Sequence, residues 1–172
     1  TFSVAGLAKK SFTDYVGSVK GSEKADYTIT FKADGASTDT KTTYYYFITG
    51  TTYASAVSAN ADSYMTRSNT LRGDGTTKQI TYYTGTQAGE ESTDWSQEYN
   101  YNGTSVKTTT DYNVDASGVL QDVTVYNDST VRTTFSVAGL AKKSFTDYVG
   151  STKGSEKADY TITFKADGAS TD

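Results

Sequence analysis

Apolar and polar residues alternate along most of the chain, which is the pattern of half-buried β-strands. The stretch Lys24–Lys32 places Tyr27, Ile29 and Phe31 on one side, with threonines and charged residues on the other. A period of two predicts an antiparallel strand that turns one face toward a core. The stretch Thr38–Phe47 has aromatic residues on both sides, which predicts a strand covered on both faces.

Short turn signals separate these stretches. Asp34-Gly35 and Asn102-Gly103 supply the positive backbone φ that hairpin turns need. Because every connection is short, consecutive strands should pair antiparallel, without room for a βαβ crossover. Thr51–Asn60 contains enough Ala for a short helix, but its Thr, Ser and Val favour a strand. The predicted strands are 24–32, 38–47, 51–60, 63–72, 76–84, 92–101, 104–114, 119–127, 130–137 and 142–149.

The first thirty-nine residues occur twice. Residues 134–172 repeat residues 1–39 at an offset of 133 with one change, Val19 to Thr152. Self-similarity at a fixed period is the sequence signature of a repeat architecture. Residues 1–133 are therefore interpreted as one full period, and residues 134–172 as the start of the next copy, in a chain with further copies.

A weaker repeat lies inside this period. Residues 15–50 align with residues 83–118 at an offset of 68, and the matches fall at turn and strand positions. Examples are Gly35 with Gly103 and Tyr44 with Tyr112. The period is thus predicted to consist of two half-units, approximately 1–67 and 68–133. With about ten strands per period, each half-unit would be a five-strand antiparallel meander.

Composition limits the class of protein. The chain is rich in Tyr and Thr, with 15 Tyr, and it contains no Cys, His or Pro. Few Leu, Ile, Val and Phe would warn of disorder, but a net charge of only −4 and the many Tyr oppose it. The absence of Cys excludes disulfides and thiolate metal sites. Mild acidity argues against nucleic acid, and no apolar run is long enough for a membrane span.

Catalytic chemistry has little support. Without His and Cys, the common Ser-His and Cys-His nucleophile pairs cannot form. A carboxylate pair could still serve glycoside hydrolysis, and Glu90, Glu91, Asp94 and Glu98 form an acidic cluster. The simpler interpretation is a solvated loop followed by the polar face of a strand. We therefore expect a protein that is not an enzyme.

Three other features carry candidate chemistry. Asp34, Asp74 and Asp115 stand beside turn residues and could offer oxygens to Ca²⁺, although Asp in such turns usually bonds its own backbone. No other cofactor is indicated. Asn102 and Asn127 begin Asn-x-Ser/Thr sequences, so both are candidate N-glycosylation sites. The run Tyr44–Tyr46 could stack on sugars, but cross-strand packing is the commoner role.

In composition and repetition the chain resembles the tandem-repeat regions of giant bacterial extracellular proteins, which include adhesins and filament-forming surface proteins. Residues 99–103 and 114–120 also resemble, faintly, the Tyr-Asp repeats of extracellular shell-forming proteins, although the regular YDxxGR signature is missing. This likeness implies an extracellular or cell-surface location. It assigns a role to no single residue.

Together these features predict an all-β antiparallel meander of tandem repeats that forms an extended ribbon, superhelix or solenoid. The alternative is a row of β-sandwich domains. The expected function is that of a structural repeat in a long extracellular filament, sheath or surface protein. Its partners would be neighbouring repeats or laterally assembled copies of itself. The alternative function is an adhesin module that binds surface glycans or Ca²⁺.

Overall fold

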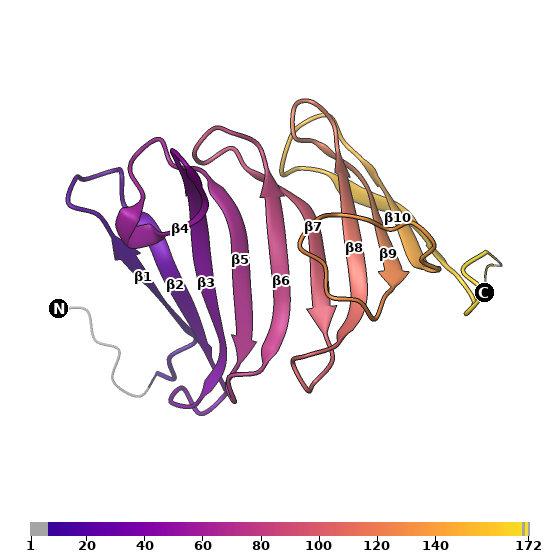
Figure 1. The fold of residues 1–172 in the computed structure, drawn as a ribbon, viewed down its shortest axis with the longest axis horizontal. Helices are drawn as coiled ribbons and strands as arrows, with labels where there is room; N and C mark the ends of the chain where they lie inside the picture. The colour runs from indigo at the N-terminus through magenta and orange to yellow at the C-terminus, as the bar shows by residue number, and fades with distance from the viewer. Residues whose placement is uncertain (1–6, 170, 172) are drawn as a thin grey trace.

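The computed structural model describes residues 7–169 and residue 171, and these form a single open β-sheet (Figure 1). All eleven strands belong to this sheet, and every pair of neighbours is antiparallel. The strands are β1 (Ser11–Val16), β2 (Lys24–Phe31), β3 (Thr38–Ile48), β4 (Thr51–Ser55), β5 (Met65–Arg72), β6 (Thr77–Thr84), β7 (Ser92–Tyr99), β8 (Val106–Val114), β9 (Leu120–Asn127), β10 (Lys142–Val149) and β11 (Lys157–Thr163).

The strand order follows the chain. It reads β1-β2-β3-β5-β6-β7-β8-β9-β10-β11, and β4 lies off this path, paired with β3. The predicted all-β antiparallel meander is therefore confirmed. Since all eleven strands share one sheet, the described residues do not form the alternative β-sandwich. Helix is limited to one 3-10 turn, η1 (Ala56–Ser58), within the described part of the chain.

The strands of the first period differ in detail from the predicted set. Nine strands, not about ten, begin within the described residues of the first 133 positions. The approximate boundary expected between half-units, near residue 67, falls inside β5 (Met65–Arg72). The division into two half-units stays a prediction. The expected strand at 51–60 ends at Ser55, where the chain turns into η1.

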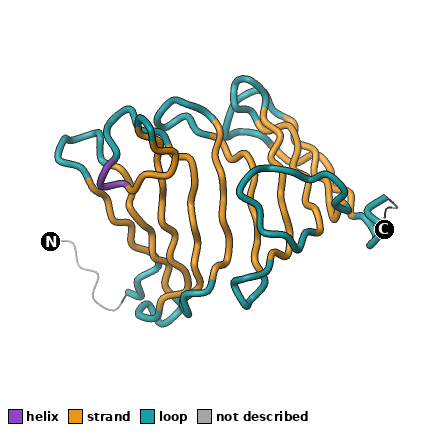
Figure 2. The backbone as a smooth tube through the Cα atoms, in the orientation of Figure 1, coloured by secondary structure: helices purple, strands orange, loops and turns teal. Residues whose placement is uncertain are grey.

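The segment 130–137 is not a strand, although its Thr and Val content predicted one. It belongs to the long connection 128–141, which lies across β7 and β8 in front of the sheet (Figure 2). Its backbone does not extend the sheet because β10 already occupies the edge of β9. The predicted pairing of 130–137 with β10 is therefore wrong.

Equivalent strands share the same irregularities of register. A bulge interrupts the ladder between Asp14 and Tyr15, and again between Tyr82 and Tyr83. The same bulge separates Asp147 from Tyr148. A bulge accentuates local twist and re-aims the side chains beside it. The backbone thus follows the sequence matches at offsets of 68 and 133.

One side of the sheet, here called the covered face, holds a row of aromatic side chains. The rings of Tyr82 and Trp95 stack with centroids 4.0 Å apart, a contact of about 0.5–1.5 kcal/mol beyond area burial. Tyr53 of β4 packs edge-on against Tyr82, and Phe135 of the long connection packs against Trp95. These two segments cover a sheet that has no second layer among the described residues.

The opposite side, here called the hydroxyl face, is lined by Thr, Ser and Tyr. Cross-strand hydroxyl pairs join neighbouring strands, as in Thr30 with Thr40 at 2.6 Å and Thr42 with Thr70 at 2.9 Å. Such pairs stabilise a sheet by roughly 0.2–1 kcal/mol each. Thr40 and Thr108 are buried on this face, and both remain hydrogen-bonded: Thr40 to Thr30, and Thr108 to the Glu98 carboxylate at 3.5 Å.

Candidate functional site

The junction between the two sequence copies is the first candidate site, because it decides whether copies join into one body. Strands β9 and β10 pair across the position where the second copy begins, with Phe145 opposite Thr124 and Asp147 opposite Asp122. Asn127 also donates its backbone N–H to the carbonyl of Ala141 at 2.9 Å. The strands on either side of the boundary are therefore paired directly with each other.

Glutamates tie the hairpin loops to strands behind them. The Oε1 atom of Glu156 accepts the backbone N–H of Leu120 at 2.9 Å. Glu91, which precedes β7, accepts the N–H of Met65 at 2.7 Å in the same way. The Leu120 amide, followed by the backbone N–H groups of Glu156 and Gly154, holds the pKa of Glu156 below its ordinary value. Hydrogen bonds to an ionised acceptor are among the stronger ones in proteins.

A lysine adds a second tie across the junction. The Nζ of Lys153, in the β10–β11 loop, donates to the backbone carbonyls of Glu90 and Glu91. Its ion pair with the Glu90 carboxylate, at 3.8 Å, is exposed and adds little. Residues from both sequence copies thus contact each other at the loop end of the sheet.

A buried polar network clamps the long connection onto the covered face. Gln97 is 1% exposed, and its amide donates to the Thr109 hydroxyl at 3.0 Å and to the Thr130 carbonyl at 2.9 Å. Its carbonyl oxygen accepts the backbone N–H of Arg132 at 2.9 Å. The alternation along residues 92–101 places Gln97 on the same side as Trp95 and so predicts a buried amide that needs a hydrogen-bond partner. Both the burial and the partners are confirmed.

Asp128 is the ionic centre of this network. Its carboxylate accepts from Arg132 Nε at 2.8 Å and from the Thr109 hydroxyl at 2.7 Å. Burial raises the pKa of Asp128, but the hydrogen bonds from Arg132, Thr130 and Thr109 outweigh burial and hold it below its ordinary value. Sequence reasoning missed this clamp. Its signal was Asp-x-x-x-Arg directly after a strand.

The three candidate calcium ligands lie in separate turns. Asp34 accepts the backbone N–H groups of Ala36 and Ser37. The Ser37 side chain and these amides lower its pKa to about 2. Asp115 bonds its own turn through Ser117 and Val119. Among the described residues, no three acidic side chains stand together as metal ligands.

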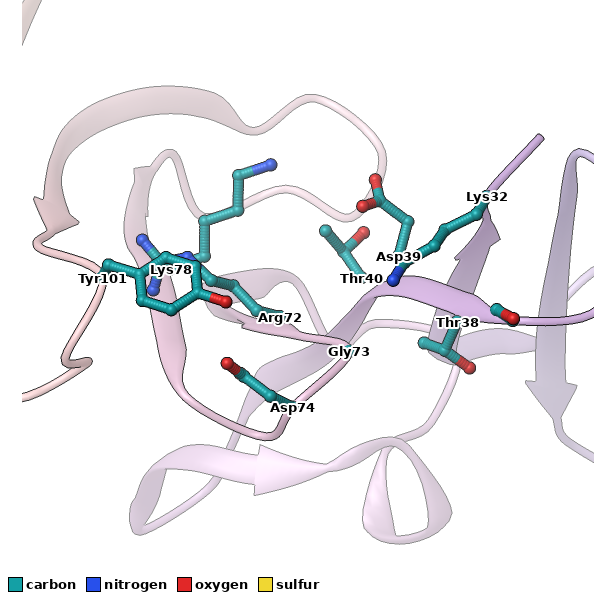
Figure 3. Close-up of a pocket in the computed structure, with 10 residues that line it drawn as sticks. Lys32, Thr38, Asp39, Thr40, Arg72, Gly73, Asp74, Lys78 and Tyr101 are labelled. Carbon is teal, nitrogen blue, oxygen red and sulfur yellow. The ribbon is translucent and has the colours of Figure 1, made fainter. Parts of the chain in front are cut away.

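Asp74 lies in an open hollow of about 620 Å³ on the opposite end of the sheet from the glutamate ties. Its carboxylate points toward the Tyr101 hydroxyl, with Arg72, Lys78 and Lys32 around the same hollow (Figure 3). Bonds from the Thr76 hydroxyl and amide lower the pKa of Asp74. The positive charges of Lys32, Arg72 and Lys78 would repel Ca²⁺ from this hollow.

The acidic residues noted in the sequence have separate partners. Glu91 ties a loop to β5, while Glu98 lies beside Lys107 on the surface. Asp94 instead lines the same open hollow as Asp111, which comes from β8. Burial, and then the charges of Asp122 and Asp94, raise the pKa of Asp111.

The run Tyr44–Tyr46 packs within the sheet. Tyr46 is buried and donates its hydroxyl to the Ala25 carbonyl at 2.8 Å. Tyr45 lies 4.4 Å beneath the Arg67 guanidinium. The glycosylation candidates Asn102 and Asn127 are both exposed, as an acceptor must be. Their modification stays a prediction.

Comparisons with protein-family models, with curated proteins and with solved structures find no match to this chain. The short helix within the described residues is neither long nor apolar enough to cross a membrane.

Proposed function

We propose that this chain is a non-catalytic structural module whose copies join, through one continuous sheet, into an elongated array. The observation that supports this most strongly is the β9–β10 ladder across the boundary between sequence copies. A module built for separate action would place a flexible linker there. This module places paired strands, a lysine bridge and a glutamate tie there instead.

The distribution of buried groups supports the same function. Stabilising contacts join neighbouring strands and their covering loops, as in the row from Tyr53 through Tyr82 and Trp95 to Phe135. Repeat proteins are stabilised by such nearest-neighbour contacts, and they need no closure over long distances. The array can therefore be lengthened by whole periods without changing its packing.

We infer further that the array serves outside the cell, in a filament, a sheath or a surface protein. The repeated sequence, the absence of Cys and the Tyr- and Thr-rich composition support this location. In that setting the array would act mechanically, as a spacer or a strand of a larger assembly. Other copies of the chain are then its natural partners.

Electron microscopy of chains with two, three and four periods tests the proposal. One period contributes eight strands to the sheet path, so each added period should lengthen the particle by about 38 Å, less the shortening from twist. We expect stiff particles of uniform width. Globular beads joined by variable hinges would contradict the proposal and would favour the adhesin alternative.

A further inference from the structure

Strands β1 and β10 have one sequence but different surroundings. Residues 9–18 and 142–151 are identical, and both strands pair with the next strand in the same register. The outer side of β10 is occupied by β9, whereas no described strand lies on the outer side of β1. The occupied edge of β10 therefore shows which strand the edge of β1, unpaired within the described part of the chain, can accept.

The backbone of β1 presents hydrogen-bonding groups along this vacant edge. The Lys10 carbonyl accepts the N–H of Phe31, so residue 10 faces β2. Because the backbone N–H and C=O groups of successive residues point to opposite sides of a strand, those of Ser11 and Thr13 point away from β2. Their counterparts Ser144 and Thr146 lie opposite Val125 and Val123 of β9. Unpaired outward groups of this kind form a template for another strand.

Side chains mark the same site. Phe12 is 44% exposed and Tyr15 is 62% exposed, whereas their counterparts Phe145 and Tyr148 are half-buried beside β9. Glu23 repeats this difference. Glu23 accepts the Gly21 amide of its own loop at 2.7 Å. Within the described residues, no neighbouring strand donates a backbone amide to Glu23. Glu156 holds the Leu120 amide in that position.

We propose that the outer edge of β1 is a docking site for β9 of a second copy of this chain. The register follows from β10: Phe12 would lie opposite Thr124 and Thr13 opposite Val123, and Glu23 would accept the Leu120 amide. Copies would join head to tail, and such an interface generates open filaments. This association goes beyond the array within one chain and does not require it.

The C-terminal hairpin β10–β11 competes for the same strand. It is tethered to β9, which gives it an effective concentration in the millimolar range. Intact chains should therefore remain mostly single. Weakening the hold of β10 on β9 should release β9 to the identical sequence in β1 of another copy. The equilibrium between β9 paired with its own β10 and β9 paired with β1 of another copy is a strand exchange.

Two matched substitutions in the full chain test this exchange. Ser144→Pro removes an N–H that faces β9, and Ser11→Pro removes the equivalent N–H of the vacant edge, at the first position of β1 where Pro is tolerated. We expect S144P to form concentration-dependent oligomers in light scattering. We expect S11P and the double variant S11P/S144P to stay monomeric. Equal association of S144P and the double variant would overturn the proposal.

A peptide keeps the test decisive if S144P fails to fold. A fluorescent peptide with the sequence of residues 118–128 should bind the full chain and protect the amides of Ser11 and Thr13 from exchange. Losing one main-chain bond should weaken its binding to S11P by about tenfold. A scrambled peptide is the control. No binding, or equal binding to both chains, would overturn the proposal.

Discussion

At the scale of single residues, the buried Gln97 side chain shows most directly how polar groups replace an apolar core. It is 1% exposed and bonded through both amide atoms to the long connection or to β8. Its strand position and its burial could be predicted from the alternation around Trp95. Its partners could not, because the segment that supplies them was predicted to be a strand.

Replacing Gln97 with Ala should destabilise the fold by about 2–3 kcal/mol, because the Arg132 amide and the Asp128 carboxylate lose a buried partner. Urea unfolding measures this change. Gln79→Ala is the matched control, since Gln79 makes one weak bond to Ser96 at 3.3 Å and is half-buried. Equal losses for the two variants would show that the clamp adds nothing.

Asp111 and Asp34 should make the free energy of unfolding depend on pH with opposite signs. Its pKa is raised by burial first, so the folded chain holds that proton more tightly than the unfolded chain does. Ionised Asp111 therefore costs stability above its folded pKa, and the cost disappears as pH falls below 3.8. Asp111→Asn should raise the free energy of unfolding at neutral pH by an amount on the order of 0.5 kcal/mol, which thermal unfolding would show as a higher melting temperature.

Asp34→Asn provides the comparison for Asp111→Asn. The pKa of Asp34 is lowered to about 2, so its contribution is present above 3.8 and is lost as pH falls toward 2. This variant should be slightly less stable than the native chain at neutral pH and equal to it in strong acid. A gain for Asp34→Asn at neutral pH would contradict the assigned directions.

At the scale of elements, the tips of hairpin turns contact the backbone of neighbouring strands, and glycine makes this close approach possible. Gly103 has φ +70°, and a Cβ there would lie 2.7 Å from the Thr77 amide nitrogen. Gly35 and Gly168 repeat this contact at Lys9 and Lys142. The Asn102-Gly103 signal predicted the turn. The approach to Thr77 depends on strands distant in sequence, so no local pattern could reveal it.

Gly103→Ala should cost about 2–3 kcal/mol, because backbone strain and a steric clash act together. Gly75→Ala is the control, since its φ of +85° is similar but nothing lies within 4 Å of the added Cβ. That control should cost about 1 kcal/mol. Thermal unfolding distinguishes the two, and identical shifts would show that Gly103 needs only its backbone conformation.

The long connection 128–141 explains why sequence analysis overcounted strands. Its residues favour strand conformation, yet Phe135 packs on Trp95, and Arg132 bonds Asp128 and Gln97. Tertiary contacts thus override local preference in this segment. By contrast, β2, β7 and β8 lie within two residues of their predicted bounds, since alternation and turn signals agree there.

At the scale of the whole molecule, each strand of the open sheet is stabilised mainly by the strands that precede and follow it in the sequence. The sequence repeat predicted continuity across residue 133, and β9 and β10, which flank the connection containing that residue, pair with each other with one bulge between Lys142 and Ser144. The pairing itself differs from the predicted one, since β9 replaces 130–137 beside β10. Edge strands with exposed Phe12 and Tyr160 mark where further strands would add stability.

Equilibrium unfolding of chains with one, two and three complete periods tests this continuity most directly. Each added period covers an exposed edge and supplies a new interface. The account therefore predicts that the free energy of unfolding per period rises with copy number and that the transition remains cooperative. A constant value per period, with each period unfolding on its own, would contradict a continuous sheet.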